Sequence, residues 1–315
     1  MNATVAIMFT IPWDPSIGFV PQMVSASSNA FVVEEKGEKV ILPHLFDVKD
    51  NSIYVVSSSG YTPTMGLDMN LLVYDLVDKS YAIRNLLMRD MAGKDLHHLR
   101  VLSDSSYLLL LYDEESPGYS VVKYDCDGSF TWKRTISDVN RYQGESVELF
   151  EDGDDILVVV YRERELIFDI VEKENGSVFR TWQEKRLADR LFQAEKGTLV
   201  GMNYDVEKNE HRLWKYNLIS RHSSYVALNR EYYGWFHNVL GVDNVRHELI
   251  LTSGKDLARY SLSDMTLNPF GFYGQLDSPE KENIPDVSVW KIDVKGEVYI
   301  PIATEAGLSF INVTL

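Results

Sequence analysis

The residues with the most useful chemistry are histidines, carboxylates and aromatic side chains that stand at or just before short apolar runs. We expect them to bind a ligand, and they are His44, His98, Tyr142, Glu148, Tyr233, Trp235, His237, Asn238 and Trp290. Histidines with a carboxylate could hold a first-row transition metal. A set of oxygen ligands would suit calcium instead, and its members would be Glu148, Asn203, Asn238 and Asp286. The alternative is that all of these are ordinary polar residues bonded to water or backbone, and no H-E-x-x-H or C-x-x-C spacing favours a metal.

Covalent catalysis has no sequence support. The chain contains no G-x-S-x-G motif and no G-x-x-x-x-G-K-[ST] loop, which serine hydrolases and nucleotide hydrolases use. The single cysteine, Cys126, stands in a predicted turn. We therefore assign no catalytic residue.

One aromatic stretch, residues 229–238 (NREYYGWFHN), is the most suggestive of binding. Aromatic side chains bring a large contact area at small entropic cost, so they could stack on a sugar ring or anchor a peptide. Packing between neighbouring sheets is the alternative. The acidic run at residues 151–155 is expected to be a solvated turn.

These residues depend on a repeated element for their positions. Six aromatic residues that end short apolar runs recur 44 to 50 residues apart, and a polar residue directly follows the first five: Tyr74, Tyr124, Phe168, Tyr216, Tyr260 and Phe310. Each repeat predicts four short antiparallel strands, for example at 107–112, 156–161 and 225–229. A period of about 40–50 residues with several strands per unit is typical of a propeller blade.

The sequence therefore predicts an all-β fold, a single six-bladed β-propeller over residues 1–315. The expected blades are 42–90, 96–137, 146–186, 190–230, 238–274, and 287–315 together with 4–11. The last repeat ends after its third strand, so the N-terminal strand is expected to complete that blade and cover two sheet edges. Residues 13–41 are expected to form a loop or small hairpin over one face, with a seventh blade as the alternative. In such a fold the candidate residues gather at one mouth of an axial channel.

Composition limits the partners. The 315 residues are 45% hydrophobic and carry a net charge of −16. This charge disfavours nucleic acid and anionic membrane surfaces, and no apolar run is long enough for a membrane helix. We expect a soluble monomer without a signal peptide. The compartment is open, and a periplasmic or cell-envelope location would apply if a leader had been removed.

Two segments, DVKDNSIYVV (47–56) and DVKGEVYIPIA (293–303), resemble the D-x-x-G-x-hydrophobic-Tyr-hydrophobic strand pair of the NHL and TolB-like superfamily of six-bladed propellers. The segment YDCDGSFTW (124–132) is similar to the turn into the outer strand of quinoprotein-type blades. The resemblance implies the architecture. Function does not transfer with it, because sites rather than folds decide function.

These features favour a non-enzymatic binding or scaffold protein that presents an aromatic and polar face to a protein or a carbohydrate. No cofactor is expected for such a protein. The alternative is a metal-dependent hydrolase or lyase, lactonase-like, with calcium or a transition metal in the axial pocket.

Overall fold

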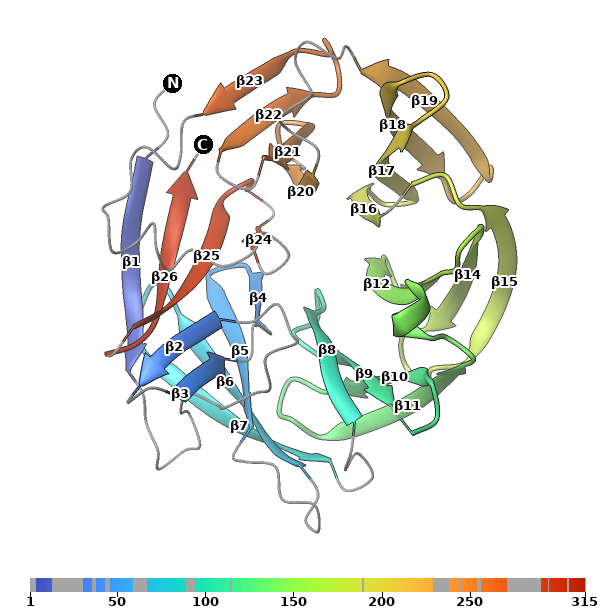
Figure 1. Ribbon diagram of the computed structural model, residues 1–315. Helices are drawn as coiled ribbons and strands as arrows, with labels where there is room; N and C mark the ends of the chain where they lie inside the picture. Colours follow the sequence, from blue (N-terminus) through green and yellow to red (C-terminus); the bar gives the residue numbers. More distant parts are fainter. Residues whose placement is uncertain are drawn as a thin grey trace. The chain divides into compact units, whose positions relative to one another are not determined.

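The computed structural model describes residues 4–12, 31–35, 38–42, 46–58, 67–88, 94–113, 115–188, 190–228, 238–243, 245–253, 256–270, 290–293, 295–304 and 306–314. Within these residues the fold is all-β and contains six four-stranded antiparallel sheets, the blades of a six-bladed β-propeller (Figure 1). Contacts between Cα atoms divide the chain into two compact units, each with three of these sheets.

One unit holds blades 1 to 3, and in each of them successive strands pair as a meander. Blade 1 consists of β4 (Phe46–Lys49), β5 (Ser52–Ser58), β6 (Leu67–Asp75) and β7 (Tyr81–Met88). Blade 2 consists of β8 (Lys94–Val101), β9 (Tyr107–Asp113), β10 (Gly118–Tyr124) and β11 (Phe130–Ser137). Blade 3 consists of β12 (Ser146–Asp152), β13 (Asp155–Tyr161), β14 (Glu165–Glu172) and β15 (Val178–Lys185).

The other unit holds blades 4 to 6. Blade 4 consists of β16 (Arg190–Glu195), β17 (Thr198–Asp205), β18 (Glu210–Asn217) and β19 (His222–Leu228). Blade 5 consists of β20 (Asn238–Asp243), β21 (Glu248–Thr252), β22 (Leu257–Ser261) and β23 (Leu267–Phe270). Blade 6 consists of β24 (Lys291–Ile292), β25 (Val298–Thr304), β26 (Gly307–Thr314) and, from the other end of the chain, β1 (Thr4–Pro12).

The predicted pairing of the two chain ends is confirmed. β1 runs antiparallel to β26, with Thr4 opposite Thr314 and Ile11 opposite Leu308 (Figure 1). The hydroxyl oxygens of Thr10 and Ser309 lie 2.8 Å apart across this pair. Because β1 covers one edge of β26, that edge is not available to pair with another chain.

β9 shows why the apolar runs become strands. Its sequence YLLLLYD is buried except for the last residue, which is half-buried. Successive side chains point to opposite faces of a sheet, so such a run requires burial on both faces. Leu109 and Leu111 join a core cluster with blade 1, while Leu108, Leu110 and Tyr112 join a cluster with blade 3.

The segment before blade 1 contributes a hairpin rather than a seventh blade. β2 (Phe31–Glu35) and β3 (Glu38–Leu42) pair only with each other. The expected small hairpin is therefore present. That it covers one face of the protein stays a prediction.

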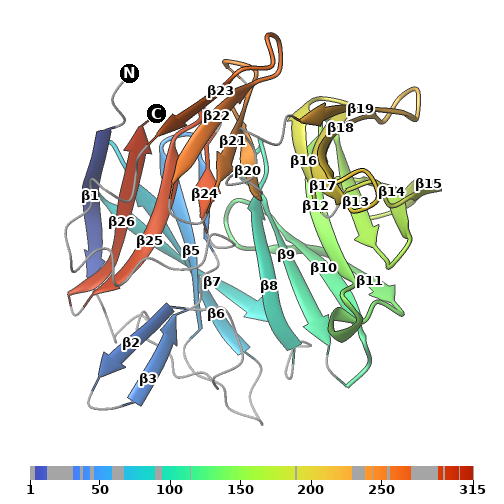
Figure 2. The same cartoon turned by 45° about the horizontal axis from the view of Figure 1, so that its top comes forward.

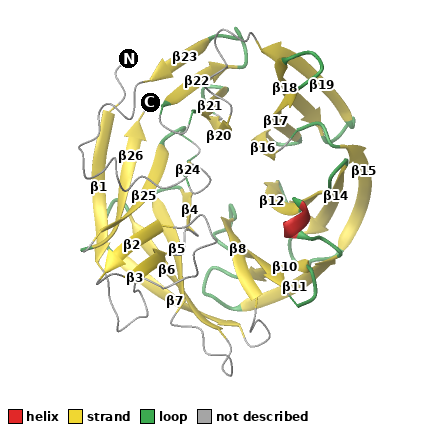
Figure 3. Ribbon diagram, viewed as in Figure 1, coloured by secondary structure: helices red, strands yellow, loops and turns green. Residues whose placement is uncertain are grey.

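Helix is nearly absent from the described residues. The three-residue 3-10 turn η2 (Arg141–Gln143) is the only helical element among them (Figure 3). None of the described helical segments has the length and apolar character that a membrane crossing needs.

Candidate functional site

The structure describes some of the predicted site residues and omits others. His44, Tyr233, Trp235, His237 and Asp286 lie outside the described residues, as does the side chain of Asn238 in β20. Tyr142 is in η2, His98 in β8 and Glu148 in β12. Trp290 lies just before β24, and its side chain is only 3% exposed. Its contact with a ligand stays a prediction.

The oxygen atoms suggested for a cation already have protein partners in two cases. The hydroxyl of Tyr161 donates to Oε2 of Glu148 over 3.4 Å, and the indole N–H of Trp214 donates to Oδ1 of Asn203 over 2.9 Å. Glu148 and Asn203 belong to different units. Among the described residues no three His, Cys, Asp or Glu side chains are grouped so that they could hold a metal ion.

The most developed cluster of polar and aromatic side chains is built on η2, between blades 2 and 3. We call it the Arg141 corner, and its members are His97, Tyr112, Tyr119, Arg141 and Tyr142. All five belong to the same unit. Figure 3 shows η2, the red element, near the start of β12.

The turn itself is fixed at both ends. Oδ1 of Asn140 accepts a hydrogen bond from the Tyr142 N–H over 3.0 Å, and Oε2 of Glu145 accepts one from the Asn140 N–H over 2.8 Å. Gly144 closes the turn with a φ of 75°, and its N–H donates to the Arg141 carbonyl. Asparagine before the turn and glycine after it are the residues that such caps favour. The backbone that carries Arg141 and Tyr142 is therefore held in one conformation.

Arg141 connects the members of the corner. Its Nη1 donates to Nε2 of His97 over 2.9 Å, and its Nη2 donates to the hydroxyl oxygen of Tyr142 over 3.1 Å. The guanidinium carbon also lies 4.6 Å from the ring centroid of Tyr112 and 5.0 Å from that of Tyr142. A cation over an aromatic ring contributes about 0.5–2 kcal/mol, depending on its exposure.

The buried rings of Tyr112 and Tyr119 pack against the other members of the Arg141 corner. Tyr112 and Tyr119 face each other across β9 and β10, with centroids 4.9 Å apart, and His97 packs edge-on against both. Burial raises the pKa of Tyr119 to about 12, against the opposing effect of the Arg141 charge, so its hydroxyl stays protonated at neutral pH. The hydroxyl of Tyr112 is buried without a hydrogen-bond partner in the described part of the chain.

A β-bulge brings His97 into this cluster. Leu96 pairs with Leu111 and His98 with Leu110, so His97 is the additional residue of β8. Bulges re-aim side chains and are frequent beside functional sites. The sequence singled out His98 as a ligand-binding residue, which stays a prediction, and the histidine of the corner is its neighbour His97.

Tyr142 is the member of the corner that reaches the surface. Its side chain is 73% exposed, although Arg141 holds it from one side and its centroid lies 6.4 Å from that of Tyr112. The sequence predicted Tyr142 but not Tyr112 or Tyr119. Their equal distance from the centre of the hairpin turn, at residues 115–116, was the signal that could have paired them.

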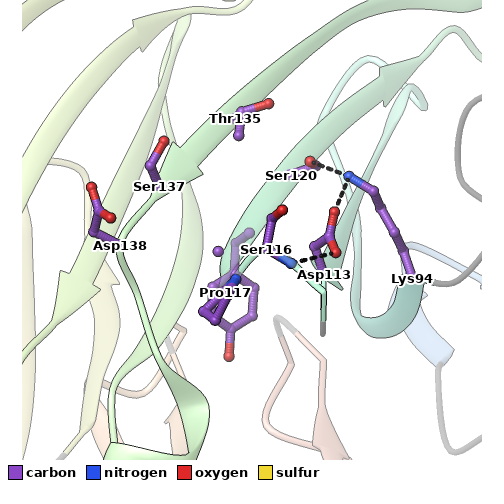
Figure 4. A pocket seen from close by; sticks show the side chains of 10 residues that line it. Lys94, Asp113, Ser116, Pro117, Ser120, Thr135, Ser137 and Asp138 are labelled. Atoms are coloured by element: carbon purple, nitrogen blue, oxygen red, sulfur yellow. Dashed lines mark hydrogen bonds and ion pairs between the residues drawn. The ribbon is translucent and has the colours of Figure 1, made fainter.

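A pocket of about 260 Å³ opens beside the hairpin between β9 and β10 (Figure 4). We call it the Lys94 pocket. Its polar lining comes from the four strands of blade 2 and the hairpin between β9 and β10, and its main residues are Lys94, Asp113, Ser116, Ser120, Thr135 and Ser137. Tyr119 borders both this pocket and the Arg141 corner. All of these residues belong to one unit.

Comparisons with known proteins add little beyond the architecture. No protein-family model matches the chain, and no curated protein is similar to it in sequence. The propeller domain of the Trilobed protease from Pyrococcus furiosus is similar in structure, with 12% identity and a TM-score of 0.48 over 85% of this chain and 82% of that one. An uncharacterised Listeria monocytogenes protein gives 12% identity and 0.46 over 90% and 77%. TolB from Acinetobacter baumannii gives 12% identity and 0.40 over 82% and 68%. At these values the similarities carry no conclusion about function.

Proposed function

We propose that the protein is a non-enzymatic binding or scaffold propeller that presents an aromatic and polar surface to a protein or carbohydrate partner. The observation that carries this proposal is the combination of exposure and fixation at Tyr142. Its ring is largely exposed, yet the capped turn and Arg141 hold it in place. A side chain fixed before binding loses little further conformational entropy, and such aromatic residues dominate the binding energy of many interfaces.

The surroundings of Tyr142 suit the same role. Arg141 is only partly buried and carries a permanent positive charge. Beneath it, the buried Tyr112 hydroxyl has no partner among the described residues, and an unsatisfied buried polar group is one that a partner's polar atom can stabilise. Arginine and tyrosine together are the residue types enriched at interface hot spots.

The proposal is tested by screening the protein on glycan arrays and peptide arrays, together with a Tyr142→Ala variant. The matched control is Phe179→Ala, which removes a 53% exposed aromatic ring from β15 of the same unit. We expect at least one glycan or peptide to bind the parent protein and the control equally, and to bind Tyr142→Ala at least tenfold less. Binding that is equal in all three proteins, or absent from both arrays, would overturn the proposal.

We also propose that the chain belongs to the NHL and TolB-like superfamily. The support is the turn formed by the second motif segment. Oδ1 of Asp293 accepts hydrogen bonds from the N–H groups of Lys295 and Glu297, and Gly296 has a φ of 79°. This geometry gives a physical reason for an Asp-x-x-Gly motif, because only glycine adopts such a φ without strain. An alignment of relatives in which the positions of Asp293 and Gly296 vary freely would contradict the assignment.

The alternative of a metal-dependent hydrolase or lyase stays a prediction. No arrangement of the described residues favours it. It would be supported by stoichiometric metal in protein purified without chelator, lost in a His98→Ala, His237→Ala double variant. Protein without bound metal would count against it.

A further inference from the structure

The Lys94 pocket has a chemistry of its own that the Arg141 corner does not share. Ser120 and Tyr119 are neighbours on β10 and point to opposite faces of the sheet. Tyr119 belongs to the core cluster with blade 3, whereas Val122, on the same face as Ser120, belongs to the cluster with blade 1. The pocket and the Tyr142 surface are therefore two sites and can be tested separately.

An ion pair organises one wall of the pocket. Nζ of Lys94 lies 3.1 Å from Oδ2 of Asp113 and donates to the Ser120 hydroxyl over 3.5 Å (Figure 4). The N–H groups of Glu115 and Ser116 donate to Oδ1 of Asp113, each over 3.1 Å. The hydrogen bond from Ser116 is the main cause that lowers the pKa of Asp113, and it acts against the effect of burial. This wall therefore offers a ligand an ammonium donor and a carboxylate acceptor side by side.

Hydroxyl groups on β11 form the next part of the lining. Thr135 pairs in register with Ser120 and Ser137 with Gly118, so both hydroxyls line the pocket from the same sheet face as Ser120 (Figure 4). Neither hydroxyl bonds to another residue in the described part of the chain. A hydroxyl both donates and accepts, so this part of the lining matches a ligand that does the same.

The charges in the lining select against anions. Besides the Lys94–Asp113 pair, the lining contains Asp138, so an anion such as phosphate would meet two carboxylates for one ammonium group. Pockets that enclose drug-sized ligands measure about 300–1,000 Å³. The pocket here, at about 260 Å³, is smaller and suits a single ring.

We propose that the Lys94 pocket binds a neutral, polyhydroxylated ring, such as one sugar residue at the end of a glycan. The carboxylate of Asp113 accepts from one ligand hydroxyl, Lys94 donates to an adjacent ligand oxygen, and the hydroxyls of Thr135 and Ser137 bond to further hydroxyls of the ring. The proposal does not depend on the Tyr142 surface.

Titration calorimetry with glucose, galactose, mannose, N-acetylglucosamine and their methyl glycosides tests the proposal, with inorganic phosphate and tetra-alanine as probes of other ligand classes. The informative variants are Thr135→Val, which keeps the shape of the side chain, and Asp113→Asn, which keeps an oxygen for the turn. Lys133→Met is the matched control, since it removes an exposed lysine from the same strand without touching the pocket lining. Thermal unfolding of each variant confirms that it is folded.

We expect at least one sugar to bind the parent protein, Lys133→Met and Tyr142→Ala alike, and to bind Thr135→Val and Asp113→Asn at least tenfold less. Unchanged affinity in Tyr142→Ala separates this site from the one under the proposed function. The proposal is overturned if no sugar binds, if phosphate or the peptide binds more tightly than every sugar, or if folded Thr135→Val retains full affinity.

Discussion

The guanidinium carbon of Arg141 lies 4.6 Å from the ring centroid of Tyr112 at the end of β9. This contact joins a residue of the connection between blades 2 and 3 to the buried core of blade 2, and the same guanidinium bonds to His97 and to the exposed Tyr142. An exposed aromatic side chain thereby gains a rigid support.

The first prediction concerns the protonation of His97. A guanidinium can only donate hydrogen bonds, so the 2.9 Å contact from Arg141 requires a lone pair on Nε2 of His97. We expect neutral His97 with its proton on Nδ1 at pH 7. Nitrogen-15 and carbon-13 NMR of the imidazole distinguishes the two tautomers, and Arg141→Gln is the comparison. A proton found on Nε2 in the parent protein would contradict the geometry of the corner.

The second prediction concerns acid stability. Glu151 accepts bonds from the Ser103 N–H over 2.7 Å and from Nζ of Lys173 over 2.6 Å, and Lys173 also pairs with Asp104 over 3.1 Å. Burial raises the pKa of the Glu151 carboxyl, but the bonds from Lys173 and Ser103 and the lysine charge outweigh burial, so the net pKa is lowered from 4.5. A pKa lower in the folded than in the unfolded protein adds stability above about pH 4.5, and this stability is lost as the pH falls through the folded value.

The corresponding variant is Glu151→Gln, measured by urea unfolding at pH 7 and pH 3. Hydrogen bonds to charged groups contribute about 1.5–3 kcal/mol, so the variant should be destabilised by about that amount at pH 7. The difference from the parent protein should shrink at pH 3, where the parent's carboxyl is also losing its charge. Glu174→Gln, in the exposed turn after β14, is the control and should change little. A difference that grows on acidification would show that the charge of Glu151 is not stabilising.

The third prediction separates backbone strain from side-chain contact. Gly144 and Gly176 have almost the same φ, 75° and 76°. A Cβ at Gly176 would lie 2.8 Å from the ring of Trp132, whereas a Cβ at Gly144 would meet nothing within 4 Å. Gly144→Ala should therefore lower the free energy of unfolding only because alanine is strained in the left-handed backbone region, by about 1–2 kcal/mol. Gly176→Ala should lower the free energy of unfolding by about 1–3 kcal/mol more than Gly144→Ala does, because Trp132 must move. Equal losses in denaturant unfolding would mean that Trp132 does not pack on this turn.

The fourth prediction concerns the pairing of the chain ends. Ile11 in β1 is 1% exposed, and Ile219, in the same unit, is 80% exposed. Ile11→Ala should lower the free energy of unfolding by about 2–5 kcal/mol, as expected for truncation in a core. Ile219→Ala should change it by less than about 0.5 kcal/mol. If Ile11→Ala lowered the free energy of unfolding no more than Ile219→Ala does, the packing of β1 in blade 6 would not stabilise the protein.

The sequence predicted strands best where both faces of a sheet are buried. The expected strands at 107–112 and 156–161 correspond to β9 (Tyr107–Asp113) and β13 (Asp155–Tyr161), because an uninterrupted apolar run leaves few other solutions. The outer strand expected at 225–229 begins earlier, since β19 starts at His222. Its first residues are polar, and they pair with β18 through backbone groups that composition does not mark.

Sites assembled from distant residues were harder to predict. The acidic run at 151–155 was expected to be solvated, which is wrong for Glu151, because Ser103 and Lys173 bind its carboxylate. Similarly, Tyr142 was recognised as an exposed aromatic residue, but its support depends on the bulge at His97 and on contacts between blades 2 and 3. Contacts of this kind follow from how sheets pack, which a local pattern of residues does not specify.

The central claim is that a partner binds to the Tyr142 ring that Arg141 positions. Its most direct test is titration calorimetry of the strongest array ligand with the parent protein, Tyr142→Phe, Tyr142→Ala and Arg141→Gln. We predict an affinity at least tenfold lower for Tyr142→Ala, a smaller loss for Arg141→Gln, and nearly full affinity for Tyr142→Phe, which keeps the ring. Equal affinities in the parent protein and Tyr142→Ala would contradict the account.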